Sequence, residues 1–122
     1  MIRIDPASAV PPFEQLRAQV VDEISSGQLA AGARLPTVRR LADDLGVAPG
    51  TVARAYRELE ASGFIETRGR NGSFVAPQGD AATQQVQRAA TAFADQVRAL
   101  RIGADEALAL VAAALRSEPT TG

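Results

Sequence analysis

The alternation of apolar and polar positions is most regular between Thr37 and Glu60. Apolar residues recur there in two runs, which are Val38, Leu41, Ala42 and Leu45, and then Val52, Ala55, Tyr56 and Leu59. Each run follows the spacing i, i+3, i+4, i+7, which places its members on one buried face of a helix. The turn between the runs contains Gly46, and Pro49 suits a first helical turn. Two short helices joined by a tight turn are typical of a DNA-binding helix-turn-helix.

The flanking segments predict a further helix and a β-hairpin. Upstream, a helix is expected to start at Pro11-Pro12 and to end at Ser25–Gly27; its apolar positions are Phe13, Leu16, Val20 and Ile24. Arg34 and Leu35 are expected to form a very short strand. Downstream, residues 64–68 and 73–75 have strand character, and the intervening residues 69–72 contain Asn-Gly, a pair that favours hairpin turns. The order predicts a mainly α-helical winged helix-turn-helix with a small β-hairpin wing over residues 1–77.

Residues 78–122 predict a different structure, two helices that are separated near Gly103. The first carries a short heptad-like seam, which consists of Val86, Ala90, Phe93, Val97 and Leu100. The second is expected over Asp105–Arg116, and its centre, residues 107–115, is apolar on all sides. The residues expected at its contact surface are Leu108, Val111 and Leu115. A helix that is apolar all round requires burial on every side. A second copy of the chain is the expected cover, so that these helices form a dimerisation tail; the alternative is that both helices pack on the winged helix within one chain.

Composition argues against several classes of protein. The chain has 122 residues and contains neither Cys nor His. This removes thiolate metal ligands, the commonest general base and the commonest metal ligand, so we expect no enzymatic activity, no metal site and no cofactor. An apolar run of roughly 18 residues or more is also lacking, which predicts a cytoplasmic protein without a membrane span. The first ten residues carry alternating Ile2 and Ile4, which predict a short extended arm.

The positions of the charged residues favour binding to nucleic acid more than the net charge does. The net charge is only −1, and all 13 basic residues are Arg. Between Arg34 and Arg70 there are seven Arg against five acidic residues, whereas from Pro77 onward there are four Arg against five acids. Arginine suits bidentate contacts with phosphate and guanine. The exclusive use of Arg could reflect these contacts with DNA. The alternative explanation for the absence of Lys is a compositional bias toward Ala and Arg.

Several motifs together resemble the DNA-binding domain of the GntR family of bacterial transcription regulators. They are Gly-x-Arg-Leu-Pro-Thr-x-Arg-x-Leu-Ala at residues 32–42, Leu-Gly-Val at 45–47, Thr-Val-x-Arg-Ala-Tyr-x-x-Leu-Glu at 51–60, and Gly-Phe-Ile at 63–65 followed by a Gly-containing wing. The resemblance covers about half of the chain. The short tail is similar to the YtrA-like subfamily, in which two helices replace the large effector domain and dimerise.

The resemblance implies double-stranded operator DNA as the partner and a set of contacts with it. Arg39 occupies the position of a base-contacting arginine, and arginine is the usual bidentate partner of guanine. Thr51 lies at the start of the recognition helix, where residues come closest to the base edges. Gly50 allows close approach of a phosphate to the helix N-terminus. The remaining predicted DNA-binding residues are Arg34, Thr37, Arg40, Pro49 and Arg54, together with Arg68, Arg70 and Gly72 in the wing.

The chain departs from the family pattern at three positions. Pro49 and Ala53 stand where many members carry Arg, and Arg40 stands where Glu is frequent. More of the base recognition is therefore expected from Arg39, Thr51 and the wing. The leading hypothesis is a homodimeric transcription regulator, a repressor that binds an inverted repeat. The alternatives are a winged-helix protein-interaction module and a small-molecule sensor, neither of which would itself recognise DNA.

Overall fold

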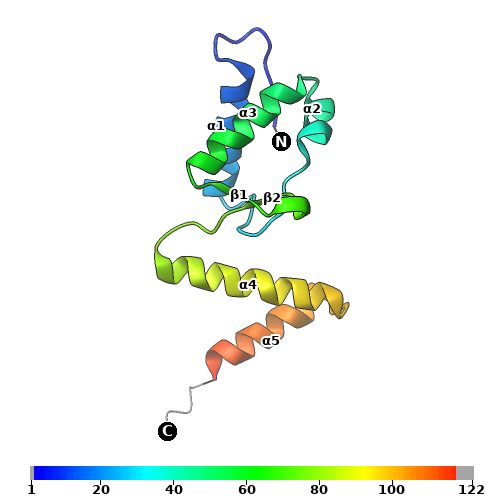
Figure 1. Ribbon diagram of the computed structural model, residues 1–122. Coiled ribbons are helices and arrows are strands. Elements are labelled where there is room, and N and C mark those ends of the chain that lie inside the picture. Colours follow the sequence, from blue (N-terminus) through cyan, green and yellow to red (C-terminus); the bar gives the residue numbers. More distant parts are fainter. Residues whose placement is uncertain (1, 118–122) are drawn as a thin grey trace. The chain divides into compact units, whose positions relative to one another are not determined.

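The structure is a computed structural model that describes residues 2–117, and it divides between Arg88 and Ala89 into two compact units. Its elements in order are α1 (Pro12–Ser25), α2 (Val38–Leu45), α3 (Pro49–Ala61), β1 (Ile65–Thr67), the 3-10 turn η1 (Gly69–Asn71), β2 (Ser73–Val75), α4 (Ala81–Ala99) and α5 (Ala104–Arg116) (Figure 1). The boundary between the units falls within α4. The division at residues 77 and 78 that the sequence suggests stays a prediction.

The helix pair forms because its ends are specified locally. The Thr37 side chain accepts a hydrogen bond from the Arg40 amide at 3.2 Å, which caps the N-terminus of α2. Gly46 ends α2 in the left-handed conformation, with a φ of 69°, which glycine adopts without steric cost. Pro49 then occupies the first turn of α3, where a missing amide hydrogen does no harm. The predicted helix-turn-helix is confirmed, and Thr37 caps its first helix.

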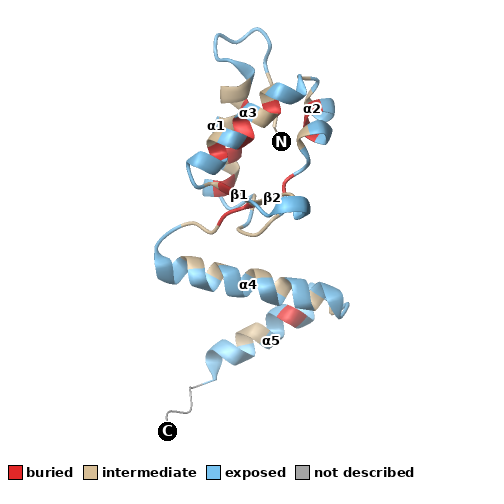
Figure 2. Ribbon diagram, in the orientation of Figure 1, coloured by how far each residue is buried: buried red, intermediate tan, exposed pale blue. Residues whose placement is uncertain are grey.

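The first unit has a core in which three helices pack with the hairpin (Figure 2). Every one of the four apolar positions predicted on the recognition helix α3 is buried. In α2, by contrast, Leu41 and Ala42 are buried while Val38 and Leu45 are half-buried at the edge of the core. The other buried core residues are Leu16, Val20 and Ile24 of α1, Leu35, Ile65 and Val75. The apolar spacing in the sequence therefore identified the faces that pack together.

The wing is a two-stranded antiparallel hairpin extended by one short segment. Its register pairs Ile65 with Val75 and Thr67 with Ser73. Arg34 forms an isolated antiparallel bridge with Phe74, and the Leu35 amide donates to the Ser73 carbonyl at 2.8 Å. The predicted very short strand at Arg34 and Leu35 therefore exists as a single bridge. It connects the hairpin to the segment that leads into α2.

The N-terminal arm is held by two glutamine side chains of α1, a feature that the sequence did not reveal. Gln19 accepts from the Arg3 amide at 2.9 Å and donates to the Arg3 carbonyl at 2.7 Å. Gln15 makes the same pair of bonds with Asp5, at 2.8 and 3.0 Å. Because the glutamines are four residues apart, their amides lie one above the other on α1 and substitute for a neighbouring strand. Ile2 and Ile4 consequently pack against the core.

The beginning of α4 is attached to the hairpin within the first unit. The Gln78 backbone and the Gln87 side chain exchange two hydrogen bonds, at 2.8 and 2.9 Å. Arg88 approaches Glu66 of β1 at 3.7 Å. Asp80 accepts a hydrogen bond from the Thr83 amide at 2.8 Å, and this bond holds the pKa of the Asp80 carboxyl below its ordinary value. These contacts fix the first turns of α4.

In the second unit, the break between α4 and α5 differs in detail from the prediction. Arg101 has the left-handed conformation, with a φ of 57°, whereas Gly103 has an extended conformation and forms the N-cap of α5. The two helices are therefore separated near Gly103, as predicted, and the left-handed turn lies two residues earlier, at Arg101. An arginine tolerates this φ at a steric cost, so its position is set by the turn and not by local preference. No helix of the described chain is both long and apolar enough to span a membrane.

Candidate nucleic-acid interface

The N-terminus of α3 is open to an approaching anion. Its N-cap is Ala48, which has no side chain that could accept a hydrogen bond from the first turn. A Cβ atom built on Gly50 would meet no atom within 4 Å, so the space around this backbone is empty. Thr51 follows and is half-buried. A helix N-terminus carries partial positive charge and unsatisfied amide hydrogens, which together attract phosphate.

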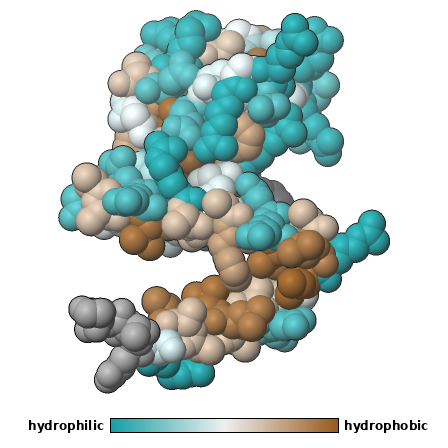
Figure 3. Space-filling view, turned by 60° about the horizontal axis from the view of Figure 1, so that its bottom comes forward, coloured by the Kyte–Doolittle hydropathy of each residue, from teal (hydrophilic) through white to brown (hydrophobic). Residues whose placement is uncertain are grey.

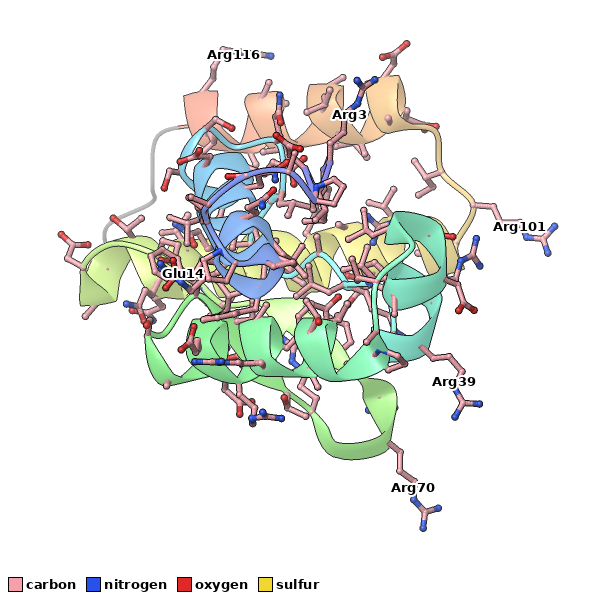
Figure 4. All side chains as sticks on the ribbon, turned by 90° about the horizontal axis from the view of Figure 1, so that it is seen from above. Arg3, Glu14, Arg39, Arg70, Arg101 and Arg116 are labelled. Carbon is pink, nitrogen blue, oxygen red and sulfur yellow. The ribbon has the colours of Figure 1, made fainter. Side chains whose placement is uncertain are left out.

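Two arginines of α2, the preceding helix, are available for contact. Arg39 and Arg40 are both exposed, and Arg40 makes a loose ion pair with Asp44 at 3.9 Å. Within residues 2–117, Arg39 has no ion pair. Figure 4 shows Arg39 and Arg70 extending into solvent on the same side of the domain, whereas Arg3 of the arm points to the opposite side. Two of the arginines for which the sequence predicts groove contacts thus lie on the same side of the domain.

The wing holds its arginines in different ways. The Arg68 guanidinium donates two hydrogen bonds to Glu66 Oε1, at 3.2 and 2.7 Å, and lies over the Phe74 ring with 4.3 Å to the centroid. Arg70 belongs to the 3-10 turn and is exposed. A side chain at Gly72 would come within 3.3 Å of Arg34 Nε. Gly72 therefore leaves room for Arg34, which brings two of the predicted DNA-binding residues together.

Arg54 is supported by an aromatic ring from a distant part of the sequence. Its guanidinium carbon lies 3.7 Å from the centroid of the Phe13 ring, which belongs to the first turn of α1. Arg54 itself is exposed, while Phe13 is half-buried. Neither this stack nor the stack of Arg68 on Phe74 could be found by helical or strand periodicity, because periodicity relates neighbours within one element only.

The predicted dimerisation residues provide an apolar surface on α4 and α5. Val86 is 68 % exposed, Leu100 63 %, Leu108 68 % and Leu115 81 %. Phe93 is 38 % exposed, Ala90 is also exposed, and Val97 and Val111 are half-buried. Figure 3 shows apolar surface gathered over these two helices. Large apolar side chains in such number on a surface are typical of a contact region.

A hollow of about 470 Å³ lies between α4 and α5 within the second unit. It is lined mainly by apolar side chains, among them Phe93, Val97, Ile102 and Leu108. Three of these residues were predicted from the heptad spacing and the apolar helix. Ile102 was not predicted, because it lies in the connection between the helices where no periodic pattern extends.

Comparison with known proteins agrees with this arrangement. The family model of bacterial regulatory proteins of the gntR family matches residues 12–75. The transcriptional regulator Rv1152 of Mycobacterium tuberculosis is 46 % identical over 107 residues, which cover 88 % of both chains. The transcriptional repressor YtrA of Bacillus subtilis is 38 % identical over 104 residues, which cover 85 % of this chain and 78 % of the relative.

A solved structure extends the similarity beyond the winged helix. The GntR-family transcription factor YtrA of Sulfolobus acidocaldarius is 28 % identical, with a TM-score of 0.60 over 93 % of this chain and 96 % of the other. The match therefore includes the two tail helices as well as the DNA-binding fold. This chain belongs to the GntR family, in which it is similar to the YtrA-like proteins, and it is a transcriptional regulator with a DNA-binding winged helix-turn-helix domain.

Proposed function

We propose that the chain is a homodimeric repressor that binds an inverted-repeat operator and blocks the promoter by occupying it. The observation that carries DNA binding is that Arg39 and Arg70 extend from the same side of the domain, in which the N-terminus of α3 has no side-chain cap. α3 would enter the major groove with Thr51 and Gly50 facing the bases and phosphates, and Arg39 would contact guanine. The wing would follow the adjacent minor groove with Arg70.

The remaining predicted contacts would position the domain on the DNA backbone. Arg34, Arg40, Arg54 and Arg68 are all exposed and basic, and Arg34 and Arg68 flank the wing. Contacts of arginine with phosphate orient a protein on the duplex but do not by themselves select a sequence. Because such contacts release counterions, binding should weaken steeply as the salt concentration rises.

The dimer is proposed from the apolar surface of the tail. Leucines that are more than half exposed, together with a hollow lined by Phe93 and Val97, are explained if a second copy covers them. Two winged helices held by such a tail would bind half-sites about one helical turn apart or more, roughly 34–36 Å per turn. A two-fold symmetric protein requires an inverted repeat. The relative named as a repressor supports the same role here.

The test begins with selection of bound duplexes from a random pool at low salt. The proposal expects enrichment of an inverted repeat whose half-sites are separated by a fixed spacing. No binding to any duplex at low salt would instead favour a protein-interaction module. Enrichment of isolated single half-sites would contradict the dimeric mode of binding.

The selected duplex then allows a test of Arg39. We expect Arg39→Ala to weaken binding to the selected duplex about 5- to 150-fold, since a bidentate contact with a base contributes roughly 1–3 kcal/mol. Binding to random duplexes should weaken less, because there the variant loses only the attraction of one positive charge for the DNA. Arg3→Ala removes the same charge from the opposite side of the domain and serves as the control, with no change expected on either duplex. An equal loss on both duplexes for Arg39→Ala would rule out base recognition by this residue.

A further inference from the structure

Two arginines of the predicted interface, Arg54 and Arg68, are stacked on phenylalanine rings. They differ in whether the N–H donors at the edge of the guanidinium are already hydrogen-bonded. Arg68 uses its edge for two hydrogen bonds to Glu66, so its donors are partly occupied. Arg54 lies over the face of Phe13 and, among the described residues, has no carboxylate partner. A guanidinium that is held through its face keeps its N–H donors, which lie in the plane of the group, free for an anion.

Phe13 is held by its backbone and by the core. Pro11 and Pro12 restrict the backbone immediately before it, and Pro11 has a φ of −57° at the N-cap of α1. Phe13 is half-buried and packs against the core of the domain. Because α1 packs against α3, its ring lies beside the exposed Arg54 of the recognition helix.

We propose that Phe13 is a positioning residue for DNA binding, and that the first turn of α1 thereby belongs to the interface. Its ring restrains the Arg54 guanidinium in one orientation and leaves the N–H donors directed outward for a backbone phosphate. An exposed arginine otherwise loses much side-chain freedom when it binds, and restraint in the free protein reduces that loss. This inference rests on the proposed function, since it requires Arg54 to contact DNA.

The test compares Phe13→Leu, Phe13→Tyr, Arg54→Ala and the double variant Phe13→Leu/Arg54→Ala on the selected duplex at one salt concentration. Arg54→Ala should weaken binding. Phe13→Leu, which keeps an apolar side chain but removes the ring face, should weaken binding about two- to five-fold, the range that corresponds to an exposed cation–π contact. Phe13→Tyr should bind as the wild type does, and the double variant should bind as Arg54→Ala does.

The outcomes separate this inference from the proposed function. If the losses from Phe13→Leu and Arg54→Ala multiply in the double variant, Phe13 does not act through Arg54 and the inference is overturned. If Arg54→Ala binds normally, the inference is also overturned, while binding of the wild type to the selected duplex preserves the proposed function. Failure of the wild type to bind any duplex would remove both.

A spectroscopic measurement on the free protein guards against a merely structural effect of Phe13→Leu. The ring should shift the NMR signals of the Arg54 side chain upfield in the wild type and in Phe13→Tyr, and this shift should vanish in Phe13→Leu. Melting curves of each variant establish that binding is measured on folded protein. Identical Arg54 signals in the wild type and Phe13→Leu would contradict the stack.

Discussion

Tyr56 links the recognition helix to the segment that precedes α2. Its hydroxyl donates to the Pro36 carbonyl at 2.7 Å, and its side chain is only 7 % exposed. The sequence predicted a core position for this residue, and the structure confirms it. The bond matters because Pro36 comes immediately before Thr37, the residue that caps α2. A single side chain thus helps to fix the relative position of the two helices of the motif.

The burial of Tyr56 makes the stability of the folded protein depend on pH in the alkaline range. Burial raises the pKa of Tyr56 to about 12, from an ordinary value of 10.0. Because the unfolded chain ionises first, the stabilisation is complete below pH 10 and is lost as the pH rises from 10 toward 12. The chain contains one Tyr, no Cys and no Lys, so no other side chain is expected to titrate in this window.

We therefore expect the free energy of unfolding to fall by about 2–3 kcal/mol across this window in the wild type. Tyr56→Phe should be less stable at neutral pH, by about 1 kcal/mol, because it lacks the hydrogen bond to Pro36. Its stability should, however, stay nearly constant across the same window. Denaturant unfolding at a series of alkaline pH values, with tyrosinate absorbance as a second signal, measures both. An ordinary tyrosinate titration in the folded wild type would contradict the account.

At the scale of the elements, the N-terminus of α3 combines weak capping with open space. Ala48 does not cap the helix, and Gly50 occupies a helical position at which an alanine would favour the helix more. A Cβ atom would meet no neighbour at Gly50, so the protein does not need glycine there in order to fold. The glycine is explained if a phosphate has to approach the backbone closely.

Gly50→Ala should accordingly change stability and binding in opposite directions. The variant should be more stable to unfolding, by about 0.5–1 kcal/mol, because alanine loses less conformational freedom on folding. Its affinity for the selected duplex should nevertheless fall, since the new methyl group lies where the phosphate would bind. Thermal melting and a binding titration on the same preparation provide the comparison. Increased stability with unchanged affinity would place the phosphate elsewhere.

The elements themselves were largely predictable because their information is local. The apolar spacing within each helix, the cap at Thr37 and the turn at Gly46 each depend on residues that are only a few positions apart. The pairing of the arm with Gln15 and Gln19 was not predictable, because it depends on side chains that substitute for a strand. The left-handed conformation of Arg101, within the predicted break, was not predictable for a similar reason. A residue with low preference for the left-handed conformation adopts it when the turn demands it.

The candidate site was predictable as a set of residues but not as an arrangement. The sequence identifies Arg54 and Arg68 as DNA-binding residues but not the side chains that hold them. Arg54 stacks on Phe13 of the distant helix α1, and Arg68 contacts Phe74 and Glu66 on the two strands of the wing. The approach of Arg34 to Gly72 likewise depends on a single bridge between separate segments. The predicted DNA-binding roles stay predictions until binding is measured.

At the scale of the whole molecule, one unit carries the candidate DNA contacts and the other carries exposed apolar surface. A single winged helix with so few long side chains on α3 has a limited area with which to select a sequence. Two linked copies would double the number of base contacts, and the second binding event would benefit from a high effective concentration. We therefore propose that the tail assembles the pair of winged helices that recognises the operator.

Val97→Asp tests this claim most directly, with Gln96→Asp as a matched control on the neighbouring position of α4. Val97 lines the apolar hollow, so a buried carboxylate there would oppose association, whereas Gln96 is exposed. The measurement is analytical ultracentrifugation of each variant, free and with the selected inverted repeat. We predict a dimer for the wild type and Gln96→Asp, and for Val97→Asp a folded monomer that binds the full repeat no more tightly than a single half-site. A Val97→Asp protein that sediments as a dimer, or a monomer with wild-type affinity for the full repeat, would contradict the account.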